Sequence, residues 1–136
     1  MVSGVVLASG RRIEESVATV VIVAVGVFFL GMGGYALAAP AALVRPFRLA
    51  ADSPESRSEV RAVYGGFGAA VAAVLGVAAF DLDLRPGIVL TVGAALAGMA
   101  AGRVVSRLLD RGTAFYPIWF YCCVEAVAAG LLFSAG

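Results

Sequence analysis

Apolar residues form four long runs along the chain, and shorter polar stretches separate them. The runs cover about residues 17–39, 59–80, 87–109 and 117–135. Each is close to the ~20 apolar residues that a helix needs to cross a bilayer. None shows the alternation of polar and apolar positions that is typical of a transmembrane barrel. The pattern therefore predicts an all-α fold, a four-helix transmembrane bundle, in which residues 1–136 form a single domain.

The connections between the runs predict how the helices alternate. Residues 81–86 and 111–116 are short polar links, so the helices that each link joins are expected to be antiparallel neighbours. The first connection is longer, and its residues 41–51 mix apolar side chains with arginine, as a segment in the membrane interface does. After it, Ser53 and Pro54 form a helix-start signal. We therefore expect antiparallel up-down connectivity with a short interfacial segment between the first and second spans.

Composition agrees with a membrane protein and narrows its chemistry. Apolar residues make up 62% of the chain, far more than in soluble globular proteins. The formal net charge is only +1, which argues against a nucleic-acid partner. The chain has no histidine, so it lacks the commonest general base and the commonest ligand of metals and haem. We therefore expect no cofactor and no metal site.

The distribution of arginine predicts an orientation in the membrane. Arg11, Arg12 and Arg85 lie on the side that holds both termini. The other seven basic residues flank the first and third connections: Arg45, Arg48, Arg57, Arg61, Arg103, Arg107 and Arg111. Because basic residues are enriched in cytoplasmic loops, both termini are expected on the non-cytoplasmic side. A cleaved signal peptide is the less favoured alternative for the first run, which has Ala-Leu-Ala at residues 36–38 but exceeds a usual signal core.

Polar residues inside the runs are the candidates for a site. Glu125 lies near the middle of the fourth run, where a carboxylate must be paired, neutralised or hydrated. At a helical rise of 1.5 Å per residue, Glu125 lies roughly 12 Å and Arg103 roughly 9 Å from the cytoplasmic helix ends. The Arg103 side chain can span that difference, and its planar guanidinium can bind a carboxylate through two hydrogen bonds. Arg61, Tyr64 and Ser106 lie near the same depth and complete a candidate polar cluster.

Three interpretations of this cluster stay open. It is a structural clasp that fixes helix order, a site for an anionic headgroup, a proton or a small solute, or a contact with another subunit. A stripe of small residues in the third run bears on the last possibility: Gly93, Ala97, Gly98, Ala101 and Gly102. Such stripes let helix backbones approach closely, either within this chain or between two copies of it.

Three motifs together resemble a known family. They are Glu59-x-Arg61-Ala62-x-Tyr64-Gly65-Gly66 at the start of the second run, Gly102-Arg103-x-x-Ser106-x-x-x-Asp110 at the end of the third, and the lone Glu125 in the fourth. The chain from about Val17 to its end resembles a family of small four-span bacterial membrane proteins that is catalogued only as a domain of unknown function. The resemblance implies four transmembrane helices in a bacterial inner membrane, with no assigned activity, cofactor or substrate. It also implies that the residues to examine as site candidates are Arg61, Tyr64, Gly65, Gly66, Arg103 and Glu125.

Two functional hypotheses follow. The leading one is a non-enzymatic integral membrane protein that serves as a small accessory or scaffold subunit, with membrane lipids and either another membrane protein or a second copy of the chain as partners. The alternative is a small-ligand or lipid-headgroup binding protein, or a transporter, that uses the Arg/Glu cluster. An enzyme acting on lipids is least favoured, because Cys122, Cys123 and Tyr64 would have Glu125 as their only base.

Overall fold

The computed structural model describes residues 2–136, with side chains from residue 8 onward, and its regular elements are all helices. Four helices are long and apolar enough to cross a membrane: Ala8–Ala38, Pro54–Phe80, Arg85–Leu109 and Phe115–Phe133. These agree with the four predicted runs, so the predicted all-α four-span fold is confirmed.

The elements follow one another in a simple order. They are α1 (Val2–Ala38), α2 (Pro40–Val44), η1 (Arg45–Phe47), α3 (Pro54–Val60), η2 (Arg61–Gly66), α4 (Phe67–Phe80), α5 (Arg85–Leu109), η3 (Phe115–Trp119) and α6 (Phe120–Phe133). The short element η2 is π-helical and η1 is a 3₁₀ turn, whereas η3 contains a kink at Tyr116, whose backbone is extended (φ −92°, ψ 135°). The second span is therefore one continuous helix made of α3, η2 and α4, and the fourth is made of η3 and α6.

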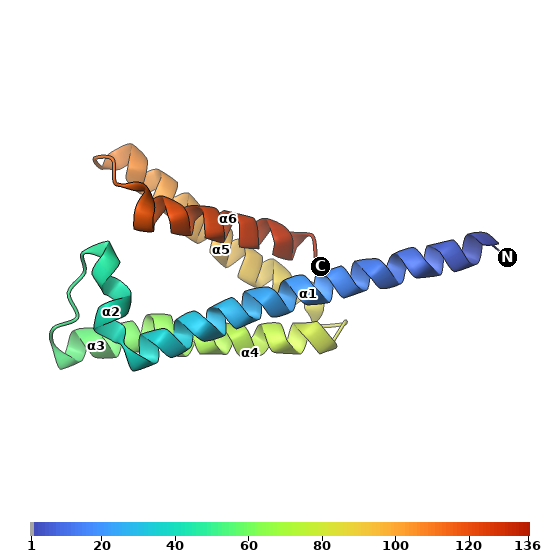
Figure 1. Cartoon of the computed structure of the whole chain (residues 1–136), viewed down its shortest axis with the longest axis horizontal. Coiled ribbons are helices and arrows are strands. Elements are labelled where there is room, and N and C mark those ends of the chain that lie inside the picture. The colour runs from blue at the N-terminus through green and yellow to red at the C-terminus, as the bar shows by residue number, and fades with distance from the viewer. Residues whose placement is uncertain (1) are drawn as a thin grey trace.

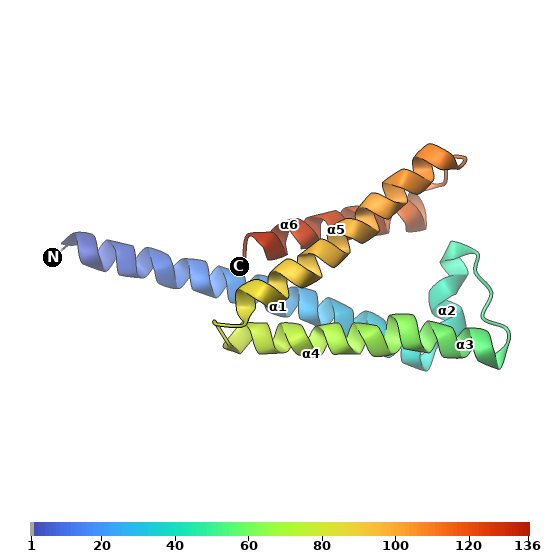
Figure 2. The ribbon, with the colours of Figure 1, turned by 180° about the vertical axis from the view of Figure 1, so that it is seen from behind.

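The four spans pack as two antiparallel pairs. Helix α1 lies along α4, and α5 lies along α6, as Figures 1 and 2 show from opposite sides. The pairs meet near the short α4–α5 connection and diverge toward the end that holds α2 and α3. We call the end where the pairs meet the narrow end and the opposite end the wide end. The buried apolar core lies toward the narrow end: Ile22, Val25, Val71, Leu75, Ala78, Ala79, Val89, Val92, Leu96, Ala129, Leu132 and Ala135. Beyond this core, the N-terminal part of α1 continues past the other helices (Figure 1).

The connection between α1 and α3 reaches across the wide end. As predicted, a helix begins after Ser53, whose hydroxyl accepts the Ser56 N–H at 3.1 Å while the Ser53 N–H donates to Ser56 Oγ. The predicted interfacial segment is the short helix α2 with η1, and it is only partly exposed, because Leu43 and Val44 are buried. Phe47 of η1 packs against Tyr121 of α6, with ring centroids 5.5 Å apart. The segment thus joins the two helix pairs where they are furthest apart.

Glycine sets the distance between α1 and α4. A Cβ atom on Gly33 would lie 3.0 Å from the backbone nitrogen of Ala69 and the backbone oxygen of Gly65. A Cβ on Gly68 would lie 3.3 Å from Gly33 Cα, so neither helix has room for a side chain here. The stripe on α5 is different. A Cβ at the GxxxG glycines, residues 98 and 102, would meet no atom of the described chain within 4 Å, and a Cβ on Gly93 would have the Phe133 side chain, not backbone, as its nearest neighbour, at 2.7 Å. The close approach of two helix backbones therefore lies between α1 and α4.

We expect Gly33→Ala to lower the midpoint of thermal unfolding in detergent, because the backbones of α1 and α4 must move apart to admit the methyl group. Overpacking of this kind costs about 1–3 kcal/mol. The matched control is Gly34→Ala on the same helix, where the new methyl group meets no atom within 4 Å. Equal midpoints for the two variants would contradict the close contact.

Candidate functional site

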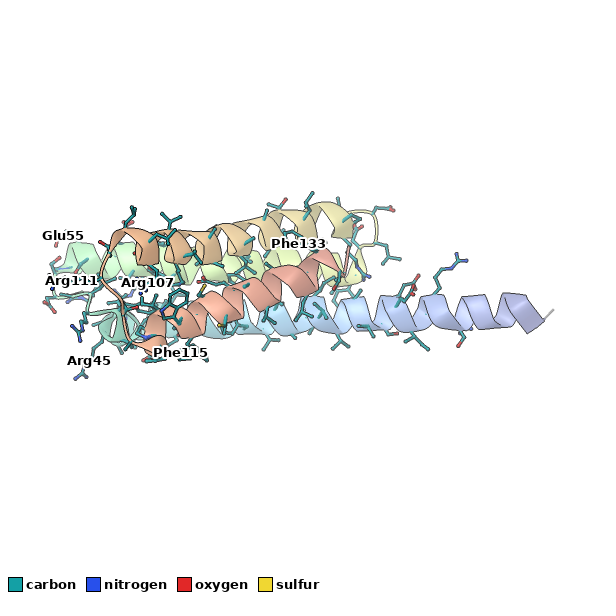
Figure 3. All side chains as sticks on the ribbon, turned by 90° about the horizontal axis from the view of Figure 1, so that it is seen from above. Arg45, Glu55, Arg107, Arg111, Phe115 and Phe133 are labelled. Carbon is teal, nitrogen blue, oxygen red and sulfur yellow. The ribbon has the colours of Figure 1, made fainter. Side chains whose placement is uncertain are left out.

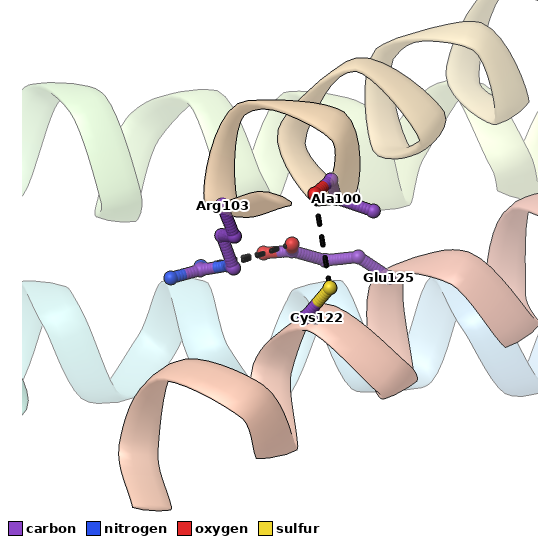
Figure 4. A network of polar contacts seen from close by, with 4 residues as sticks. All are labelled: Ala100, Arg103, Cys122 and Glu125. Carbon is purple, nitrogen blue, oxygen red and sulfur yellow. Dashed lines mark hydrogen bonds and ion pairs between the residues drawn. The ribbon is translucent and has the colours of Figure 1, made fainter. Parts of the chain in front are cut away.

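The centre of the candidate site is an ion pair between α5 and α6. Arg103 Nε donates to Glu125 Oε2 at 2.8 Å, and Arg103 Nη2 donates to Glu125 Oε1 at 2.6 Å (Figure 4). The carboxylate side chain is 6% exposed and the guanidinium side chain 21% exposed. Both carboxylate oxygens thus bind the fork of one arginine, a geometry that suits a charge away from water.

Helical periodicity places the two residues opposite each other. On α6, Glu125 shares the buried face with Cys122, Ala129 and Leu132, which lie at spacings of three or four residues. Cys122 adds a weak contact across the same interface, with its Sγ 3.7 Å from the Ala100 carbonyl oxygen (Figure 4). The ion pair is therefore part of the α5–α6 contact.

Two neighbouring aromatic rings lie against one side of the guanidinium. Arg103 Cζ lies 6.0 Å from the ring centroid of Phe47 and 5.8 Å from that of Tyr121. Both distances allow a favourable contact between the cation and the ring faces. Since Phe47 belongs to η1, the connection at the wide end takes part in the site.

A cavity of about 130 Å³ lies between the two helix pairs, next to the ion pair. Arg103 and Glu125 are the charged residues in its lining, and Tyr64 lies in the wall formed by the second span. The remaining lining is apolar: Val25, Phe28, Phe29, Met32, Leu43, Val44, Phe47, Val63, Phe67, Gly68, Leu96, Met99, Tyr121, Val124 and Ala128, where Tyr121 contributes its ring. The site is thus an aromatic-rich apolar space with a charged, internally paired group in one wall.

The structure brings together part of the predicted polar cluster. Arg103, Glu125 and Tyr64 line one cavity. Arg61 instead donates from Nε to the Leu37 carbonyl oxygen at 3.0 Å, in the last turn of α1. Ser106 donates to Asp110 Oδ2 at 3.2 Å along α5. Arg61 therefore joins the ends of two helices, and Ser106 makes a local surface contact.

Sequence reasoning missed one buried arginine. Arg85, which the sequence places in a polar link, is 6% exposed. Its Nε donates to the Ala78 carbonyl oxygen at 2.9 Å, and its Nη2 donates to the Ala79 carbonyl oxygen and to Thr19 Oγ1, each at 3.0 Å. The side chain binds carbonyls at the C-terminal end of α4, where a cation is favourable. No spacing in the sequence distinguishes this arginine from an exposed one, apart from its position a few residues after an apolar run.

Other arginines gather at the wide end. Arg45, Arg107 and Arg111 all lie at that end of the molecule, opposite the N-terminal part of α1 that continues past the other helices (Figure 3). Within residues 2–136 no three acidic or cysteine side chains come close enough to hold a metal ion.

Comparison with known proteins gives a family and no activity. Residues 17–135 match the family described as "Domain of unknown function (DUF4345)". No curated protein and no solved structure matches the chain.

We expect Glu125→Gln to destabilise the bundle, because it leaves the Arg103 charge without its partner. Breaking a buried ion pair costs about 3–5 kcal/mol, and the partial exposure of Arg103 should place the loss nearer 2–3 kcal/mol. The double variant Arg103→Met/Glu125→Leu, which removes both charges, should recover most of that loss. The measurement is the free energy of unfolding in bicelles, with Ser106→Ala as the control at an exposed polar pair. The single variants Arg103→Met and Glu125→Leu complete the comparison. If the double variant loses as much stability as these two lose together, the two residues act independently.

Proposed function

Because the chain belongs to the DUF4345 family, whose function is unknown, no activity passes to it from relatives, and we propose a function from the site itself. The proposed function is non-enzymatic binding of a lipid from the surrounding bilayer. The cavity between the two helix pairs carries this proposal. It lies among four helices that are long and apolar enough to cross a membrane, so the molecules nearest to it are membrane lipids.

The size and lining of the cavity support an apolar occupant. Its volume of about 130 Å³ is similar to that of an engineered apolar cavity of about 150 Å³ that stays dry and binds benzene. One ring or a short length of hydrocarbon chain therefore fits, with the rest of the lipid outside. Phe28, Phe29 and Phe67 supply flat apolar surfaces, and Met32 and Met99 are flexible enough to adapt to different shapes.

The same geometry favours binding over catalysis. Glu125 is the carboxylate in the cavity wall, and both of its oxygens are engaged by Arg103. The nearby Cys122 thiol points to the Ala100 carbonyl. With no histidine in the chain, neither group has a partner that would activate it as a base or nucleophile. A non-enzymatic role is therefore part of the proposal.

The continuity of the spanning helices favours a lipid-binding protein over a transporter. Many transporters bind their cargo where a spanning helix is broken near the middle of the membrane. Helix α1 continues through residues 31–34, and Gly65 and Gly66 lie in the π-helical η2, which stays part of one continuous span. Tyr64, also in η2, faces the cavity, and π-helical turns often occur at functional sites.

The proposed setting is the inner membrane of a bacterial cell, with the wide end in the cytoplasm. Arg103 is paired inside the bundle and Arg85 is buried, so neither counts as a loop charge. Seven arginines less Arg103 leave six at the wide end, and three less Arg85 leave two at the other. The basic excess at the wide end supports an orientation with both termini outside the cytoplasm.

A role as an accessory or scaffold subunit is the second candidate. It is favoured by the outward face of α5, where Gly98 and Gly102 are exposed and a Cβ built on either would meet no atom of another described residue within 4 Å. Small residues at this spacing allow another helix to approach closely. The partner in this case is another membrane protein or a second copy of the chain.

Lipid binding is tested by filling the cavity. Ala128→Leu places a larger side chain in its wall, and we expect the lipid that co-purifies with the protein to fall by about tenfold, since a displaced apolar contact of a few methylenes costs more than 1.4 kcal/mol. Native mass spectrometry of the protein released from mild detergent measures this. Ala126→Leu, on the exposed face of the same helix, is the matched control. Equal lipid retention in both variants would exclude the cavity as the binding site.

The subunit role makes a separate prediction. Gly98→Leu/Gly102→Leu should remove a partner chain that co-purifies at fixed stoichiometry, while the unfolding midpoint changes little, because both glycines face away from the rest of the chain. Gly76→Leu, at an open position on α4, is the control. If wild-type protein extracted from its membrane carries no partner chain, the subunit role is contradicted.

A further inference from the structure

One nitrogen of the Arg103 guanidinium donates no hydrogen bond within the described part of the protein. Nε and Nη2 bind Glu125, whereas Nη1 donates to no acceptor in the described part of the chain. The structure holds no buried side-chain nitrogen or oxygen without a partner among the residues it describes, so Nη1 must reach accessible space. In Figure 4 the outer part of the guanidinium extends past the carboxylate, away from Glu125.

The residue that carries this nitrogen is part of the cavity wall. Arg103 lines the cavity together with Phe47 and Tyr121, whose ring centroids lie 6.0 and 5.8 Å from its guanidinium carbon and 5.5 Å from each other. These rings limit how far the guanidinium can swing, and Glu125 fixes its plane through two hydrogen bonds. The free N–H groups are therefore held in place beside an apolar space, as a donor that selects one group of a ligand must be.

Charge decides which acceptor fits. The positive charge of Arg103 is balanced by Glu125, and no other charged residue among those described lines the cavity. An anionic group would bring an unbalanced charge into a site of low polarity, which is costly. A cationic group would have to displace Arg103 from both oxygens of Glu125. A neutral acceptor needs neither change and gains a hydrogen bond from a charged donor.

We propose that the cavity selects lipids by a neutral carbonyl group, which accepts a hydrogen bond from Arg103 Nη1 while apolar atoms next to the carbonyl occupy the cavity. The proposal rests on the proposed lipid-binding function and specifies its ligand class. Glu125 acts as a positioning residue: it orients the guanidinium and cancels its charge. Two membrane sources offer this chemistry, the ring carbonyl of a quinone and the ester carbonyl of an acylglycerol.

The test compares three probes that share one hydrocarbon chain: methyl oleate, oleate and oleyl methyl ether. They carry a neutral carbonyl, an anionic carboxylate and no carbonyl, respectively. Wild-type protein, stripped of lipid in detergent, is incubated with each probe, and binding is measured by native mass spectrometry. Methyl oleate should bind about tenfold more tightly than either of the others, the value of one hydrogen bond to a charged group. Equal or tighter binding of oleate or of the ether overturns the proposal.

Glu125→Gln provides a sharper result, because it leaves Arg103 as an unbalanced cation. The preference should then reverse, with oleate bound more tightly than methyl oleate. A purely structural Glu125 would weaken all three probes alike, and that outcome counts against the proposal. If this variant does not fold, the wild-type comparison of methyl oleate with the ether still decides the question.

Two further experiments distinguish lipid binding from carbonyl selectivity, and a quinone from an acylglycerol. If Ala128→Leu leaves the binding of every probe unchanged, the lipid-binding function itself fails. If Ala128→Leu weakens all three probes but wild type does not favour methyl oleate, only the carbonyl selectivity fails. Parallel incubations with a short-chain menaquinone and with dioleoylglycerol identify which source binds, and binding of neither overturns the proposal.

Discussion

The cost of a carboxylate inside a membrane is the constraint on which this structure depends. Glu125 lies well within the fourth span, and it meets that cost through the two hydrogen bonds that it accepts from Arg103 on the preceding span. The ion pair is therefore satisfied within one helix pair, α5 and α6. Helices α1 and α4 do not have to supply a partner, so they are free to diverge from α5 and α6 at the wide end.

Much of this fold is predictable because two strong signals act along the chain. Membrane thickness fixes the length of each apolar run, so the four spans follow from hydropathy. Short links fix which helices are neighbours, so residues at similar depth on α5 and α6 can be compared directly. The pair of Arg103 and Glu125 follows from that comparison, because a long side chain tolerates an error of a few ångströms in depth.

The rest of the site depends on helix rotation and tilt, which depth alone does not give. Arg61, Arg85 and Ser106 all find acceptors other than Glu125, because a carbonyl at a helix end or a neighbouring carboxylate lies within their reach. Backbone carbonyls carry no sequence signature, so the burial of Arg85 is invisible in the sequence. The glycine contact is equally hidden: Gly33 and Gly98 look alike in the sequence, and only packing distinguishes the contact at α1 and α4 from the open face of α5.

The size of the side chains along the helices explains why the bundle is packed at one end and open at the other. Alanine, valine and leucine fill the narrow end, where the backbones lie close and a small side chain completes the contact. Large rings line the wide end, including Phe29, Phe47 and Phe67, yet they leave a cavity between the helix pairs. In a water-soluble protein an apolar cavity of this kind stays dry, whereas in a bilayer the surrounding solvent is itself apolar and can enter it. The polar pair in its wall, with one donor left unused, is the feature on which the proposed selection of lipids by a neutral carbonyl depends.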